Sequence, residues 1–147
     1  MMETPLTALT EDELDTFVSI AIRRAEILDE AKSPMADEAW REVMVYEERL
    51  AAITDSAEIP GGIARAGAVM AALSAGQRLE AKRLAALYLA DERLPAERRA
   101  AIERAFREDL ERRARRFPVL AGTGRLSEVD TWRVAVSSSP RVFPMAA

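Results

Sequence analysis

The sequence predicts an all-α protein, a compact bundle of four to five helices followed by an extended C-terminal arm. Apolar residues recur with a helical period through most of the first 117 residues, and helix-start and helix-stop signals separate the periodic segments. The composition, 49% hydrophobic and 31% charged with only 5% aromatic residues, is typical of a folded globular chain. A chain of 147 residues can bury a core without disulfides or metals. We therefore expect a helical bundle domain over residues 1–117 and an arm over residues 118–147 that packs on the bundle or on a partner.

The first predicted helix begins at Glu11. Thr10 and Glu13 have the spacing of a capping box, and acidic residues follow where the first helical turn favours negative charge. At 100° per residue, one face of this helix collects apolar residues: Leu14, Phe17, Val18, Ala21, Ile22, Ala25 and Leu28. Further apolar residues widen that face well past the usual stripe: Ile20, Ile27 and Ala31. The pattern predicts a helix that is covered on two sides.

The second predicted helix runs from Pro34 to about Thr54. Ser33 is a preferred N-cap residue, and a proline fits the first helical position. The apolar stripe of this helix is narrower and consists of Ala39, Val43, Tyr46, Leu50 and Ile53. The following segment "DSAEIPGG", residues 55–62, predicts a break.

Small residues dominate the third predicted helix, residues 63–75. Short side chains let neighbouring backbones approach closely, so we expect this helix to lie buried at the centre of the bundle. Gly76 can end it, and residues 77–93 continue as a fourth helix after either a turn or a kink.

The fifth predicted helix follows Pro95 and runs to about Arg116, ahead of Phe117 and Pro118. Its apolar stripe consists of Ile102, Phe106, Leu110 and Phe117. Arg99 and Arg113 project within this stripe, where an unpaired buried charge is costly. We expect each to require an acidic partner or an interface.

The composition removes most catalytic chemistry. Cysteine, histidine and asparagine are absent, and Gln77 is the only carboxamide side chain. Triads that use histidine or cysteine are therefore excluded, as are ordinary zinc sites. We predict no catalytic, cofactor-binding or metal-ligating residue and expect a protein that is not an enzyme.

A small enzyme that uses only carboxylates is the second alternative, because the sequence contains two pairs of adjacent acidic residues. They are Glu47 with Glu48 and Asp91 with Glu92. Consecutive helical residues point about 100° apart, so the two members of a pair do not converge on one substrate. We expect these pairs to lie on solvated faces.

The location expected from the sequence is the cytoplasm. No apolar run is long enough for a membrane span, and the N-terminal stretch is acidic, unlike a signal peptide. We expect no membrane insertion. Arginine supplies 19 of the 21 basic residues, a bias that fits the GC-rich coding DNA of a bacterial source.

Charge is segregated along the chain. Residues 1–60 hold 15 acids and 5 bases, a net charge of −10, whereas residues 61–147 hold 10 acids and 16 bases, a net charge of +6. Arg112, Arg113 and Arg116 end the predicted fifth helix and are candidate contacts for an acidic partner. The helix dipole also favours cations at that position. We expect the acidic first half to meet the basic second half, within one chain or head-to-tail between chains.

The C-terminal arm carries apolar and aromatic residues that a solvated terminus does not need. Its candidate partner-binding residues are Trp132, Val134, Arg141 and Phe143. Aromatic anchors with few charges are typical of interface cores, so the arm is predicted to dock on another protein. The alternative is that Trp132 and Phe143 fold back and cap the chain's own bundle.

A helix-turn-helix is the alternative interpretation of residues 72–89, since Gly76 lies between two helical segments and Arg78, Lys82 and Arg83 follow it. A plain helical hairpin explains the same pattern, and the net charge of −4 disfavours nucleic-acid binding.

The function predicted from the sequence is therefore a non-catalytic protein–protein interaction module. Such a module is an adaptor, a small subunit of a larger assembly or a regulatory or inhibitory binder, and it docks through helical faces and the arm. Its expected partner is another protein or a second copy of the chain, and no cofactor is expected. A nucleic-acid-binding regulator that uses residues 72–89 is the first alternative.

Overall fold

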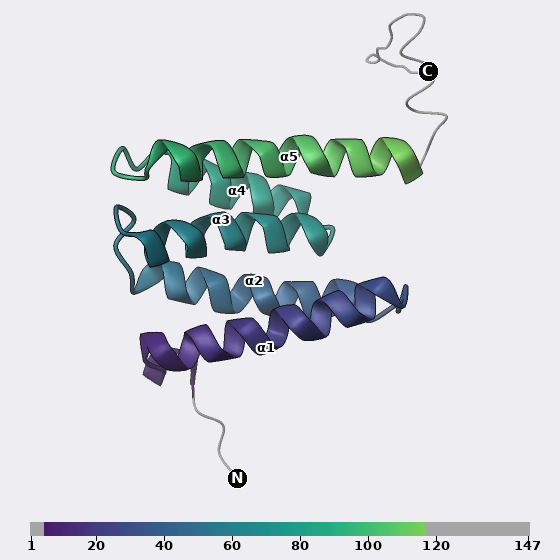
Figure 1. Ribbon diagram of the computed structural model, residues 1–147, viewed down its shortest axis with the longest axis horizontal. Helices are drawn as coiled ribbons and strands as arrows, with labels where there is room; N and C mark the ends of the chain where they lie inside the picture. Colours follow the sequence, from purple (N-terminus) through teal and green to yellow (C-terminus); the bar gives the residue numbers. More distant parts are fainter. Residues whose placement is uncertain (1–4, 117–147) are drawn as a thin grey trace, which may run out of the picture. The chain divides into compact units, whose positions relative to one another are not determined.

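A computed structural model describes residues 5–116, and every regular element in this range is helical (Figure 1). The elements are a 3₁₀ turn η1 (Leu6–Ala8) and the helices α1 (Glu11–Glu30), α2 (Ala36–Ala52), α3 (Ile59–Ser74), α4 (Arg78–Leu89) and α5 (Ala96–Arg116). The predicted all-α class is confirmed. The chain divides into two compact units after Phe106, within α5, and each is described separately. The boundary expected at residue 117 stays a prediction.

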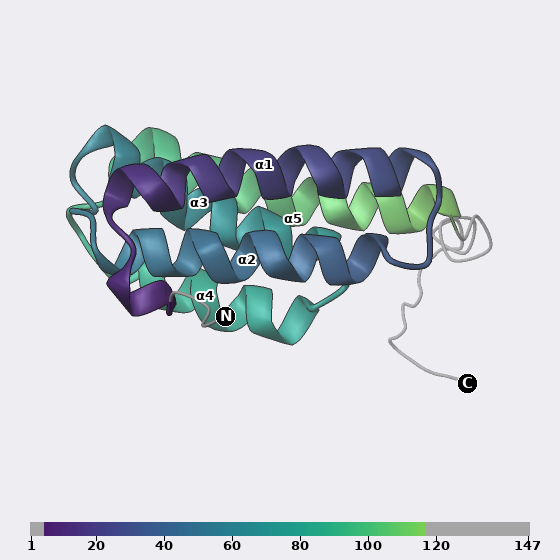
Figure 2. The same cartoon turned by 90° about the horizontal axis from the view of Figure 1, so that it is seen from below.

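Successive helices in the first unit run antiparallel and pack as neighbours. The main interfaces join α1 to α2, α2 to α3 and α3 to α4. Figure 2 shows α1 and α3 on one side and α2 and α4 on the other, so the helices alternate between two layers. As a result, α1 and α3 both pack on α2 rather than extensively on each other.

The start of α1 confirms the predicted capping box. The Thr10 hydroxyl accepts a hydrogen bond from the Glu13 amide at 3.2 Å, and the Glu13 carboxylate accepts one from the Thr10 amide at 2.9 Å. Both bonds satisfy amides that have no partner within the helix. These local bonds fix the start of α1 at Glu11, as predicted.

The prediction for the start of α2 was wrong by two residues, because α2 begins at Ala36. Lys32 has a φ of 54°, in the left-handed region, so the chain turns sharply there. The Ser33 hydroxyl accepts a hydrogen bond from the Met35 amide at 3.1 Å and closes this turn. Ser33 therefore caps the connection between α1 and α2 rather than the helix itself.

The start of α3 was also predicted wrongly, because the helix begins at Ile59 and includes Gly61 and Gly62, which were expected to belong to the break after the second helix. Proline at residue 60 fits the first turn, where its missing N–H costs nothing. A Cβ on Gly61 would lie 1.9 Å from the Asp55 carbonyl oxygen, and one on Gly62 would lie 2.7 Å from Cγ of Arg98. Both glycines therefore permit close packing.

A turn, not a kink, separates α3 from α4. Gly76 has a φ of 76°, the Gln77 amide donates to the Ala72 carbonyl at 2.8 Å, and the Gly76 amide donates to the Leu73 carbonyl at 3.0 Å. This is the Schellman arrangement that ends many helices. The helix α4 ends at Leu89, a few residues before the predicted Arg93.

The core lies around α3, which confirms the prediction of a buried central helix. Its alanines are buried and bring α2 and α4 close to its backbone. The largest fully buried side chains of the described residues are Leu14, Val43, Val69, Leu84 and Ile102. All of them come from apolar faces with helical spacing.

The predicted burial of α1 on two sides was wrong for the described residues. Leu14, Val18 and Ala25 face α2 and are buried, but Ile20 and Ile27 are 61% and 53% exposed. The helix is thus covered by the first unit on one side only, and its outer side carries apolar residues to the surface.

Candidate interaction surface

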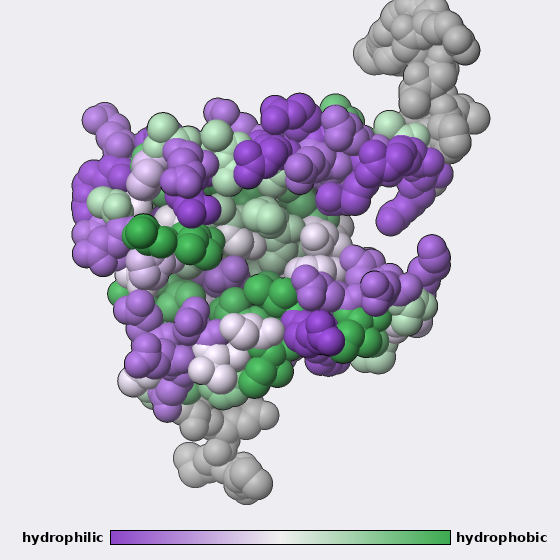
Figure 3. Space-filling view, viewed as in Figure 1, coloured by the Kyte–Doolittle hydropathy of each residue, from purple (hydrophilic) through white to green (hydrophobic). Residues whose placement is uncertain are grey.

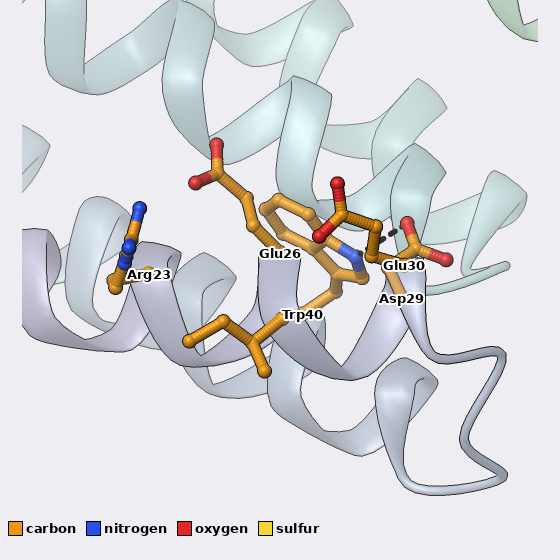
Figure 4. A pocket seen from close by; sticks show the side chains of 6 residues that line it. Arg23, Glu26, Asp29, Glu30 and Trp40 are labelled. Carbon is orange, nitrogen blue, oxygen red and sulfur yellow. Dashed lines mark hydrogen bonds between the residues drawn. The ribbon is translucent and has the colours of Figure 1, made fainter.

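A pocket of about 530 Å³ lies where the end of α1 faces the start of α2 (Figure 4). Successive turns of α1 contribute most of its lining, and α2 contributes one aromatic side chain. The lining residues are Arg23, Glu26, Ile27, Asp29, Glu30 and Trp40.

Trp40 is the only aromatic side chain in this lining, and it is half-buried. Its Nε1 donates a hydrogen bond to the Asp29 carboxylate at 3.2 Å, which orients the indole (Figure 4). Glu26 and Glu30 carry two further carboxylates to the same pocket, whereas Arg23 is its only cation. The pocket therefore combines an indole with an excess of negative charge.

An apolar stripe forms a second surface feature, on α3. It consists of Ile59, Ile63 and Met70, whose exposed fractions are 73%, 47% and 49%. Spacings of four and seven residues place them on one side of a helix that is otherwise mostly buried. Figure 3 shows hydrophobic residues over α3 and over α1 on this face of the molecule. We call these three residues the α3 stripe.

Glu47 is an ionisable side chain inside the first unit, so its predicted place on a solvated face was wrong. It is only 5% exposed. The missing side chain at Gly67 makes room for it, since a Cβ there would lie 1.9 Å from Oε2 of Glu47. Burial raises the pKa of Glu47 to about 7, and the nearby Asp15 carboxylate acts in the same direction.

The neighbouring carboxylate Glu48 points elsewhere, and lies 3.2 Å from the Arg83 guanidinium. The two members of this pair therefore diverge, as their adjacency in a helix requires. Glu47 does not line the pocket of Trp40. Within residues 5–116, no group of three or more acidic side chains is arranged to hold a metal ion.

Among residues 5–116, Arg99 has no acidic partner, which corrects the prediction for that residue. Its guanidinium donates to the main-chain carbonyls of Leu89, at 2.9 Å, Leu94, at 3.1 Å, and Asp91. These carbonyls belong to the end of α4 and the loop that follows. Arg99 thus satisfies acceptors that the end of a helix leaves open.

The arginines at the end of α5 belong to the second compact unit. Arg113 does have an acidic partner, because its Nε lies 3.4 Å from the Asp109 carboxylate; Arg112 lies 3.0 Å from the same group. Arg116 is exposed. The two ion pairs span three and four residues of one helix and leave their arginines substantially exposed, so each stabilises only weakly.

The four predicted contacts of the arm, Trp132, Val134, Arg141 and Phe143, lie outside the described residues. The only predicted partner-binding side chains that the structure places are therefore the arginines of α5.

The segment proposed as a helix-turn-helix forms the antiparallel hairpin of α3 and α4 (Figure 1). Arg83 on α4 forms ion pairs with Glu80 and Glu48, so its charge is already compensated. Leu84 and Tyr88 on the same helix are buried in the core. No helix among residues 5–116 is both long enough and apolar enough to span a membrane.

Sequence reasoning missed the pocket of Trp40 and the α3 stripe. The acidic residues that surround Trp40 are spread over the end of α1, and nothing in their spacing pairs them with a residue of the next helix. The α3 stripe had a local signal, because Ile59, Ile63 and Met70 follow a helical period, but the assumed break at residues 55–62 removed Ile59 from the helix.

Comparison with known proteins gives no match to a family model, to a curated protein or to a solved structure.

Proposed function

We propose that this protein is a non-catalytic protein–protein interaction module that docks through its helical faces and its C-terminal arm. The observation that supports this most directly is the α3 stripe, because it exposes three large apolar side chains on the central helix of the fold. Grouped apolar side chains at a surface are typical of sites that another protein covers. The absence of cysteine and histidine from the sequence also favours binding over catalysis.

The test is to place a charge on the α3 stripe. We expect Ile63→Glu to abolish the interaction with the physiological partner and to leave helix content unchanged, since the side chain already contacts solvent. Leu79→Glu is the matched control, because Leu79 is an exposed leucine on α4, outside the stripe. Quantitative affinity purification followed by binding measurements with the recovered protein would compare the variants. Equal binding by Ile63→Glu and Leu79→Glu would contradict a role for the stripe.

A further inference from the structure

We propose that the pocket of Trp40 binds arginine side chains from the last turns of α5 of a second copy of this chain. This inference rests on the proposed function, because it names the partner of one face of the interaction module. It places the partner's cations against the indole and the carboxylates that line the pocket.

The pocket has the chemistry that recognises a guanidinium group. Glu26, Asp29 and Glu30 supply three carboxylates against the single cation of Arg23. A guanidinium pairs with carboxylates through several N–H groups and also stacks on an indole ring. Because Trp40 is held by its hydrogen bond to Asp29, the ring is already oriented before a ligand arrives.

Access for a helix to this pocket lies along the outer side of α1. Ile27 lines the pocket and is 53% exposed, and Ile20 lies two turns earlier on the same outer side. An incoming helix can therefore bury apolar side chains on α1 while its arginines reach the carboxylates. Such a surface fits a basic amphipathic helix better than a free cation.

The chain itself carries the complementary segment. Four arginines lie within residues 112–116, at the C-terminal end of α5. Arg112 and Arg113 share one carboxylate, that of Asp109, and the side chains of these two arginines are substantially exposed. Leu110, also exposed, adds an apolar side chain one turn before Arg113. The net charges of −10 over residues 1–60 and +6 over residues 61–147 favour the same pairing.

The two surfaces are different, so the interface is head-to-tail. Each copy offers its pocket to one neighbour and its arginine-rich turn to another. The assembly should therefore grow with protein concentration and dissociate as salt screens the charges.

The experiment uses the full chain and two charge-reversal variants. The pocket variant carries Glu26→Lys with Glu30→Lys, and the helix variant carries Arg112→Glu with Arg116→Glu. A control variant carries Glu58→Lys with Glu103→Lys, which changes the net charge by the same amount as the pocket variant does, at exposed positions outside both surfaces. Light scattering after size exclusion gives the mass across a concentration series at low and high salt, and circular dichroism confirms that each variant is folded. A milder pocket variant, Glu26→Gln with Glu30→Gln, serves if charge reversal unfolds the protein.

We expect the unmodified chain and the control to self-associate at low salt, and each reversal variant to remain monomeric. The milder variant should bind about tenfold more weakly. Mixing the two reversal variants should restore association. The intact helix of the pocket variant meets the intact pocket of the helix variant, and the two reversed surfaces are again opposite in charge.

The inference is overturned if the unmodified chain is monomeric under all these conditions, if mixing the two reversal variants does not restore association, or if neither reversal weakens association. A monomer in which the two reversals alter each other's thermal stability would mean that the contact forms within one chain, which also overturns it. None of these results tests the α3 stripe. If Ile63→Glu fails to bind the physiological partner, the proposed function is supported even where this inference fails.

Discussion

At the scale of single residues, Glu47 has the most unusual environment. It is almost fully buried, and it makes no hydrogen bond or ion pair with any residue that the structure describes. Burial, aided by Asp15, raises the pKa of Glu47 to about 7 from its ordinary value of 4.5. The folded state therefore holds this proton more tightly than the unfolded state does. Between pH 4.5 and 7, unfolding releases a proton, so the contribution of Glu47 to stability falls as the pH rises.

Replacing Glu47 by glutamine should remove this dependence. A raised pKa of this size corresponds to about 3 kcal/mol of destabilisation by the ionised carboxylate above pH 7. We expect Glu47→Gln to gain stability relative to the unmodified chain by up to about that amount between about pH 4 and pH 8. Chemical denaturation at a series of pH values measures this, with the exposed Glu103→Gln as the control. Parallel stability curves for the two proteins would show that Glu47 ionises normally in the fold.

For Arg99, the sequence predicted that the side chain needs partners but not which groups those partners are. Its position within the apolar stripe of α5 correctly indicated a need for partners. The partners are main-chain carbonyls of Leu89, Asp91 and Leu94, and not the carboxylate that charge pairing suggests. The loop that presents these carbonyls is set by tertiary packing, which no side-chain pattern records.

At the scale of elements, the helices were predictable, but the starts of α2 and α3 and the end of α4 were not. Apolar periodicity and the local bonds of Thr10 and Glu13 located α1, since both depend only on residues near in sequence. The start of α3 depended on contacts with residues that are not its neighbours on the helix, such as Asp55 beside Gly61. The pocket of Trp40 was unpredictable for the same reason, because it joins two helices whose register only the folded structure fixes.

The contact between α2 and α3 gives a prediction at this scale. Gly67→Ala alone should destabilise the protein by about 1–3 kcal/mol, because the new Cβ would meet the Glu47 carboxylate. In a Glu47→Ala background the obstacle is gone, and the same change should stabilise by up to about 1 kcal/mol through helix propensity. Thermal unfolding of the four proteins of this double-mutant cycle measures the difference. Additive effects would mean that Gly67 is not required to accommodate Glu47.

Gly61→Ala provides the comparison within the same helix. Its Cβ would meet the main-chain carbonyl of Asp55, which cannot rotate away as a side chain can. The cost of this change should therefore be the same in the unmodified chain and in the Glu47→Ala background.

At the scale of the whole molecule, the question is what the C-terminal arm adds to the core that residues 5–116 form. The buried hydrophobic cluster runs from Leu14 to Ala105, and its members pack on one another. We therefore expect a chain that ends at residue 117 to stay helical by circular dichroism and to unfold cooperatively. The salt-sensitive self-association that we propose should persist, because Arg112 and Arg116 are retained, whereas binding that depends on the arm should be lost.

The full chain with Trp132→Ala separates docking from folding. If the arm supplies an interface anchor, this change should weaken assembly more than Arg141→Ala does, because buried aromatic anchors carry more binding energy than exposed charges at an interface rim. Light scattering and partner-binding measurements on both variants, compared with the shortened chain, give the answer. Unfolding of the shortened chain would instead make the arm part of the fold, and equal assembly by Trp132→Ala and Arg141→Ala would leave the helical faces as the docking surface.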